Sequence, residues 1–215
     1  MGTAQAVTLL SEDFEGASNL FAAGTYNYAQ NYTMANLLVP GGGAKYMKGG
    51  AGINGSVSTN IFTASGSPLS LLTGGITGTQ IDGGLISYNL YAQFSTYLTQ
   101  NDHGTLAVQF FDGESGPIGS LLQIGGSAFV SALGSGNNGS YTDARDWGAD
   151  SLAGIVPSGA RFASVQIFEV KTANGTAIDG YMDNVNFTIS EVPEPGAVAL
   201  LALGGGLLAL ARRRR

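Results

Sequence analysis

Residues 86–98 read ISYNLYAQFSTYL, and apolar and polar side chains alternate along them. Successive side chains of a strand point to opposite faces, so this alternation predicts a half-buried antiparallel strand. We expect the apolar face to point into a core and the polar face into solvent. The apolar set is Ile86, Tyr88, Leu90, Ala92, Phe94 and Leu98, and the opposite set is Ser87, Asn89, Tyr91, Gln93, Ser95 and Tyr97.

The chain on both sides of this stretch repeats the pattern of strand and turn. Residues 101–104 predict a turn and residues 106–110 alternate after it, so we expect these two strands to form a hairpin. Residues 40–56 and 64–84 are rich in glycine and predict loops, and no helix is expected before the tail. Five more strands are predicted, at residues 7–14, 57–62, 118–124, 162–170 and 181–189, with Asn-Gly turns at 54, 138 and 174.

The predicted fold is all-β: one antiparallel β-sandwich or jelly roll over residues 7–190. The chain has 34 glycines, and only 11% of its residues are charged, which fits strands and turns better than surface helices. Residues 1–190 carry five basic and thirteen acidic residues, a net charge of −8. Such a surface disfavours nucleic acid and anionic lipid as partners. Because there is no cysteine, disulfides and thiolate metal sites are excluded.

The last residues form a tail with three parts. The first part contains two prolines, which cannot donate backbone hydrogen bonds and therefore end the β body. Gly196–Ala211 is apolar and as a helix would span roughly 24 Å, a little less than the ~30 Å hydrocarbon core. We therefore expect one short transmembrane helix with the arginines in the cytoplasm and the body exported. The first part of the tail is Val192, Pro193, Glu194 and Pro195, and the third part is Arg212, Arg213, Arg214 and Arg215.

This tail, residues 191–215, resembles the PEP-CTERM sorting signal. The resemblance implies an exosortase-type membrane transpeptidase as partner, a precursor in the inner membrane, and delivery to the cell surface or to an exopolysaccharide matrix. An ordinary tail anchor is the alternative. At the other end, residues 1–6 include Ala4-Gln5-Ala6, which fits the end of a signal peptide, so we expect the mature protein to begin near Val7.

Five short motifs are spread along the body: Glu12–Glu15, Gln100–His103, Val108–Asp112, Val156–Arg161 and the closing Asp179–Val185. With these motifs the body resembles the galactose-binding-like jelly rolls, a plan shared by many carbohydrate-binding modules. The resemblance implies a β-sandwich, and in such folds a structural calcium commonly ties the first strand to the last.

Asp183 is the residue that a period-two pattern makes unusual. In the last predicted strand it falls on the same face as Val185, Phe187 and Ile189, so its carboxylate would point toward the core. A buried carboxylate needs a cation or hydrogen-bond donors. The resemblance implies calcium, with Asp13 or Glu15 and Asp183 as ligands. The alternative is that Asp183 is solvated, or bonded to backbone N–H groups, at the start of the strand.

Carbohydrate binding is the functional hypothesis for the polar face. Tyr91 and Tyr97 lie on one strand face, and Trp147 lies in a polar segment where exposure is expected. Aromatic rings support the C–H faces of sugars, and amides and hydroxyls bind sugar hydroxyls. An ordinary solvated sheet face would contain the same residue types, which leaves a structural surface protein without a small ligand as the alternative.

Catalysis is not expected. His103 is the single histidine, and no Gly-x-Ser-x-Gly motif is present, so a Ser-His-Asp hydrolase has little support. A polysaccharide hydrolase using two of the thirteen acidic residues is a weaker alternative, because the sequence does not show which carboxylates lie close together. No cofactor other than calcium is predicted.

Overall fold

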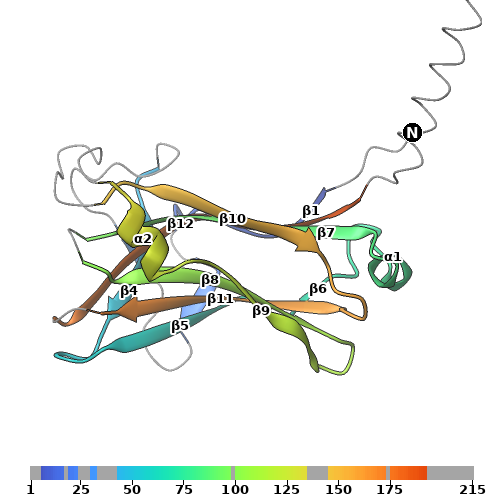
Figure 1. Ribbon diagram of the computed structural model, residues 1–215, viewed down its shortest axis with the longest axis horizontal. Coiled ribbons are helices and arrows are strands. Elements are labelled where there is room, and N and C mark those ends of the chain that lie inside the picture. The colour runs from blue at the N-terminus through green and yellow to red at the C-terminus, as the bar shows by residue number, and fades with distance from the viewer. Residues whose placement is uncertain are drawn as a thin grey trace, which may run out of the picture.

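Two antiparallel sheets pack face to face in the computed structural model, which describes residues 6–16, 19–23, 30–32, 43–97, 100–134, 145–172 and 175–192 (Figure 1). The first sheet has the order β10 (Gly148–Ile155), β7 (Ile86–Thr96), β12 (Ala177–Glu191), β4 (Tyr46–Ala51) and β3 (Gln30–Tyr32), and β1 (Ala6–Glu12) also pairs with β12. The second has the order β2 (Phe21–Ala23), β5 (Ser58–Ala64), β11 (Phe162–Lys171), β8 (His103–Phe111) and β9 (Pro117–Gly125), and β6 (Leu69–Ser70) also pairs with β11. The predicted antiparallel β-sandwich is confirmed.

The core lies between the two sheets and is built from the faces that the alternation predicted. On β7 the apolar residues from Ile86 to Phe94 are buried, while Asn89 on the other face is exposed. Each large apolar side chain buried in this way contributes about 1.5–3 kcal/mol. The central strands of the second sheet supply the facing side chains, namely Ala163, Val165 and Ile167 of β11 and Leu106, Val108 and Phe110 of β8.

The predicted hairpin between residues 86–98 and 106–110 is wrong. β7 belongs to the first sheet and β8 to the second, so the chain crosses from one layer to the other between them. Both strands still bury one face in the same core, which is why their periodicity could not reveal the crossing. Asp102 holds the crossing in place, because its carboxylate accepts hydrogen bonds from the backbone N–H groups of Thr172 (2.6 Å) and Asp179 (3.1 Å).

The hairpin partner of β8 is β9. Asp112 makes the turn between them: its Oδ1 accepts hydrogen bonds from the backbone N–H of Glu114 (2.8 Å) and of Gly116 (2.7 Å). Ser115 has a φ of 71°, in the left-handed region that such tight turns require.

Two glycine-rich segments that predicted loops contain regular structure. β4 lies within residues 40–56, and β6 and the short helix α1 (Gly78–Asp82) lie within residues 64–84. A second short helix, α2 (Ser127–Ala132), follows β9, so the expectation of no helix before the tail is wrong. The prediction also missed β10, the edge strand of the first sheet, whose exposed face includes Ala149, Ala153 and Ile155 and so shows little polar contrast.

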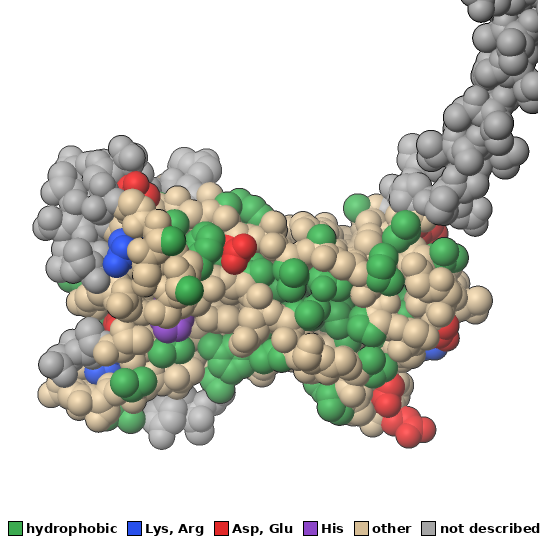
Figure 2. Space-filling model, in the orientation of Figure 1, with side chains coloured by type: hydrophobic (Ala, Val, Ile, Leu, Met, Phe, Trp, Pro, Cys, Tyr) green, Lys and Arg blue, Asp and Glu red, His purple; other side chains and the backbone are tan. Residues whose placement is uncertain are grey.

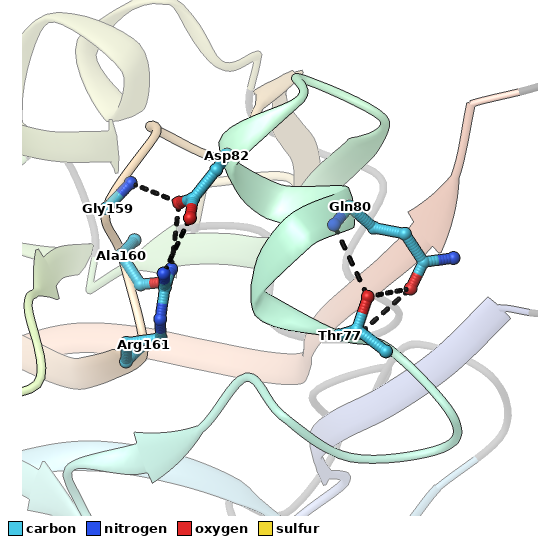
Figure 3. A network of polar contacts seen from close by, with 6 residues as sticks. All are labelled: Thr77, Gln80, Asp82, Gly159, Ala160 and Arg161. Carbon is cyan, nitrogen blue, oxygen red and sulfur yellow. Dashed lines mark hydrogen bonds and ion pairs between the residues drawn. The ribbon is translucent and has the colours of Figure 1, made fainter.

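Local side-chain contacts explain α1 (Figure 3). Thr77 Oγ1 accepts a hydrogen bond from the backbone N–H of Gln80, and Gln80 Oε1 accepts one from the backbone N–H of Thr77, which is a capping box. At the other end, Asp82 pairs with Arg161 (2.7 Å) and accepts a hydrogen bond from the backbone N–H of Gly159 (2.9 Å). Arg161 holds the pKa of Asp82 below its ordinary value.

One open edge of the sandwich faces the viewer in Figure 2, and apolar side chains gather along the seam between the layers. Leu122 of β9, Leu152 of β10 and Phe129 of α2 are partly buried there against the core. Asp150 of β10 closes the seam by accepting a hydrogen bond from the backbone N–H of Gly125 (2.9 Å).

Several sequence predictions fall outside the described residues. These are most of the signal-peptide segment (residues 1–5), the Asn-Gly turns at 138 and 174, and the tail from residue 193 onward, with its transmembrane helix and arginines. In the part of the chain that the structure describes, neither helix is long and apolar enough to cross a membrane. The turn at Asn54-Gly55 is confirmed, and Gly55 has a φ of 71°.

Candidate functional site

A β-bulge in β12 reverses the predicted direction of Asp183. The register between β12 and β7 shifts between Asp183 and Asn186, and Asn184 has a φ of 50°. On the N-terminal side of the bulge Met182 lies in the core, whereas on the C-terminal side Val185 does. Because the extra residue changes the alternation, Asp183 lies on the outer face of the first sheet. The prediction that it shares a face with Val185, Phe187 and Ile189 is wrong.

This outer face is hollowed into a pocket of about 620 Å³ beside the bulge. The pocket spans three neighbouring strands, and most of its lining residues are polar, with one aromatic ring and one valine. The lining residues are Ser11, Glu12 and Asp13 from β1 and its end, Asn89, Tyr91 and Gln93 from β7, and Asn184, Val185 and Asn186 from β12.

The bulge also fixes the amides of the pocket. Asn184 Nδ2 donates a hydrogen bond to Gln93 Oε1 (2.7 Å), which orients both side chains and leaves their remaining polar atoms for other partners. Tyr91 lies opposite Asn186 of β12 on one side and opposite Ser151 of β10 on the other. The outward residues of β10 beside β7 are small and exposed: Ala149, Ser151 and Ala153. No bulky neighbour on β10 therefore covers the tyrosine ring.

The end of the pocket at β1 is acidic. Glu12 is only 8% exposed, and its two oxygens accept hydrogen bonds from the backbone N–H of Phe14 (2.7 Å) and Leu20 (2.6 Å). Asp13 Oδ1 accepts one from the backbone N–H of Glu15 (3.1 Å). Glu15 Oε1 in turn accepts from Ala44 and Lys45, joining the end of β1 to the start of β4. Backbone donors therefore hold these carboxylates in place.

Asp183 lies next to this acidic end, at the place where β1 and β4 pair with successive parts of the same edge of β12. It is 1% exposed and accepts a hydrogen bond from the backbone N–H of Asn184 (2.7 Å). Burial, with a smaller contribution from the charges of Glu15, Asp13 and Glu12, raises the pKa of Asp183 to about 7. The three predicted calcium ligands are therefore neighbours. However, no three His, Asp or Glu side chains among the described residues form a group that could hold a metal ion.

The other two predicted aromatic residues lie outside the pocket. Tyr97 follows the last residue of β7, and its backbone N–H donates to the carbonyl oxygen of Asp179 (3.1 Å). Trp147 is partly buried and packs edge-on against Tyr46, with ring centroids 5.6 Å apart. The structure thus brings Tyr91 together with amides from β12, and it places Trp147 in an aromatic cluster with Tyr46 and Tyr181.

Sequence reasoning found Tyr91, Asn89 and Gln93 but missed Ser11, Asn184 and Asn186. The only signal for the bulge was an asparagine at position 184, since asparagine tolerates positive φ better than other non-glycine residues. Pairing of β1 with β12, which adds Ser11 and Glu12 to the pocket, depends on contacts far apart in sequence.

His103 begins β8, and its Nδ1 lies 2.7 Å from the carbonyl oxygen of Asn101. Asp102 beside it is committed to Thr172 and Asp179. Asp102 therefore connects the segments at the crossing between the sheets.

The fold and the pocket define a β-sandwich protein with a largely polar pocket on one outer sheet face. Residues 191–215 match the PEP-CTERM protein-sorting motif, which indicates an exported protein that is processed at the membrane. The comparison with curated proteins finds no match.

Among solved structures, the chain is similar to the CBM22-1 xylan-binding domain from Paenibacillus barcinonensis, at 10% identity and a TM-score of 0.43, covering 89% of this chain and 99% of that one. It is similar to CBM27-1 from Caldicellulosiruptor saccharolyticus in complex with mannohexaose, at 16% identity and a TM-score of 0.41, covering 86% and 97%. It is also similar to the K3 cleaved adhesin domain of Lys-gingipain from Porphyromonas gingivalis, at 15% identity and a TM-score of 0.44, covering 85% and 99%.

Proposed function

We propose that this protein is a non-catalytic carbohydrate-binding protein of the cell surface or the exopolysaccharide matrix, delivered there by an exosortase-type transpeptidase. One observation carries the binding function: the Tyr91 ring and the amides of Asn89, Gln93, Asn184 and Asn186 line a single pocket. A ring of this kind supports the apolar face of a sugar, and amides donate to and accept from its hydroxyls. The volume of about 620 Å³ is in the range of small-molecule sites.

The Tyr91→Ala variant is expected to bind oligosaccharides roughly tenfold more weakly, because a central aromatic contact typically dominates an interface. Binding would be measured on a glycan array and then by calorimetry with the best soluble oligosaccharide. Tyr97→Ala is the matched control, since Tyr97 lies outside the pocket. Equal affinity of the Tyr91→Ala variant and the native protein for every bound glycan would place binding elsewhere.

The surface form is expected to have lost its tail. If an exosortase recognises Pro193, Glu194 and Pro195, mass spectrometry of protein released from the cell surface should show a C-terminus near residue 195 and no arginines from 212 onward. The last strand of the β-sandwich ends at Glu191, so cleavage near residue 195 leaves every strand intact. Surface protein that retains the full tail would contradict this delivery route.

Calcium at Asp13, Glu15 and Asp183 stays a prediction. If a calcium ion binds there, it stabilises the native state by about 2.7 kcal/mol when its free concentration is 100 times its dissociation constant. EDTA should then lower the melting temperature, followed by circular dichroism, and Asp183→Asn should remove the effect. A melting curve that is the same with EDTA and with added calcium would leave this acidic cluster without a metal.

A further inference from the structure

We propose that the pocket prefers glycans that carry a protonated amino group and rejects glycans that carry carboxylates or sulfates. This inference rests on the proposed function, because it names the class of carbohydrate that the same pocket would take.

The lining of the pocket carries negative charge only. Glu12 and Asp13 are its charged residues, and the other lining residues are neutral. Glu12 cannot turn away from a ligand, because both of its oxygens accept backbone hydrogen bonds. An anionic sugar would have to lie against these fixed carboxylates without a basic partner from the pocket walls.

Lys45 lies beside the acidic end but does not line the pocket, and its ammonium group donates to backbone oxygens. Lys45 Nζ donates hydrogen bonds to the backbone carbonyl oxygens of Glu15 and Gly16, both at 3.0 Å. The two ion pairs found among the described residues, Lys48 with Asp179 and Arg161 with Asp82, leave Glu12 and Asp13 without a salt bridge. The acidic end of the pocket is therefore free to attract a cation from the ligand.

The neutral part of the pocket matches the ring and the hydroxyl groups of an amino sugar. Tyr91 offers an apolar ring face, and the amides of Asn89 and Asn186 can bond with hydroxyl groups. An amine at the acidic end would then form a charge-assisted hydrogen bond with Asp13. The net charge of −8 over residues 1–190 acts in the same direction, because it repels polyanions at longer range.

The test compares three soluble oligosaccharides of equal length: a glucosamine oligomer, its N-acetylated form, and a galacturonate oligomer. Affinities would be measured by calorimetry at low salt, in EDTA, at a pH where the amine is protonated. We expect the amine to bind about fivefold more tightly than the N-acetylated form, the upper range for a partly exposed ion pair, and the galacturonate not to bind. High salt should remove most of the difference.

Asp13→Asn is expected to abolish the preference for the amine, so that the ratio of the two affinities falls from about five to about one, because asparagine removes the charge but keeps the oxygen that accepts from Glu15. The matched control is Glu114→Gln, which removes the same charge from the exposed turn between β8 and β9 and should keep the preference.

Equal binding of the amine and the N-acetylated form, both lost in Tyr91→Ala, would overturn the charge preference and leave the carbohydrate-binding function standing. Preference for the galacturonate would also overturn it. If none of the three oligosaccharides and no glycan of the array binds, both proposals fail.

Discussion

Raising the pH from about 5 to about 9 is expected to lower the free energy of unfolding by roughly 4 kcal/mol through Glu169 alone. Glu169 of β11 is fully buried, and among the described residues neither of its carboxyl oxygens has a hydrogen-bond partner. Burial, with a smaller contribution from the charge of Asp102, raises the pKa of Glu169 from 4.5 to about 8. Between these values the unfolded chain releases the proton and the native state keeps it, so stability falls as the pH rises.

Three glycines pack against the Glu169 side chain. A Cβ atom built on Gly104 would lie 2.6 Å from Glu169 Oε1, and one on Gly49 would lie 2.8 Å from Glu169 Cβ. Gly180 of β12 closes the third side. The acid is therefore packed tightly between backbones of both sheets, where ionisation is not compensated.

Urea unfolding at a series of pH values measures this effect, and two variants separate its causes. Glu169→Met should remove the contribution of Glu169 to the pH dependence and be more stable than the native protein at pH 8, because an apolar chain of similar length replaces an unpartnered acid. Glu169→Gln should also lose that contribution but be less stable than Glu169→Met, since its amide is left without partners. The slope that remains reports on Asp183, whose pKa is also raised. If the free energy of unfolding changed with pH in both variants as it does in the native protein, Glu169 would not be the cause of the pH dependence.

Gly180→Ala is expected to destabilise the protein by about 3 kcal/mol, the upper end for overpacking in a rigid site. Its Cβ would lie 2.7 Å from the carbonyl carbon of His103 and 2.9 Å from the backbone nitrogen of Gly104, and it would collide with the Glu169 carboxyl group. Backbone atoms of β8 and β12 cannot move apart without separating the two sheets at this end of the core.

The matched control is Gly113→Ala in the exposed turn between β8 and β9. No atom lies within 4 Å of a Cβ at Gly113, so we expect a change within about 0.5 kcal/mol. Chemical unfolding of both variants under the same conditions gives the difference. If Gly180→Ala were as stable as Gly113→Ala, the close approach of the two sheets at Glu169 would be wrong.

The sequence was sufficient for most strands because each has one buried face. β7, β8 and β11 bury alternate residues, and period-two alternation is a local property that every such strand must show. β10 was missed because its exposed face carries Ala149 and Ala153, which weakens the contrast between faces. The short β4 was missed because Gly49 and Gly50 interrupt its pattern and Gly52 follows it. Gly49 and Gly52 allow close contact with other residues.

The candidate site was predictable only in part. Tyr91 and Gln93 could be placed on the polar face of β7 from alternation alone. The positions of Asn184 and Asp183 could not, because the bulge adds one residue to β12 and reverses the alternation there. A bulge depends on how two strands pair, and the pattern within one strand does not report that.

The sequence by itself determined the class of fold and the sorting signal, because both depend on short-range patterns. These patterns are alternating side chains in the body, and two prolines, an apolar run and arginines in the tail. The tertiary structure alone decided which sheet each strand joins, which way Asp183 points, and that Ser11, Tyr91 and Asn186 share one pocket. These features require residues distant in the chain to meet, and the free energy that selects such meetings comes from burial and register across the whole sandwich.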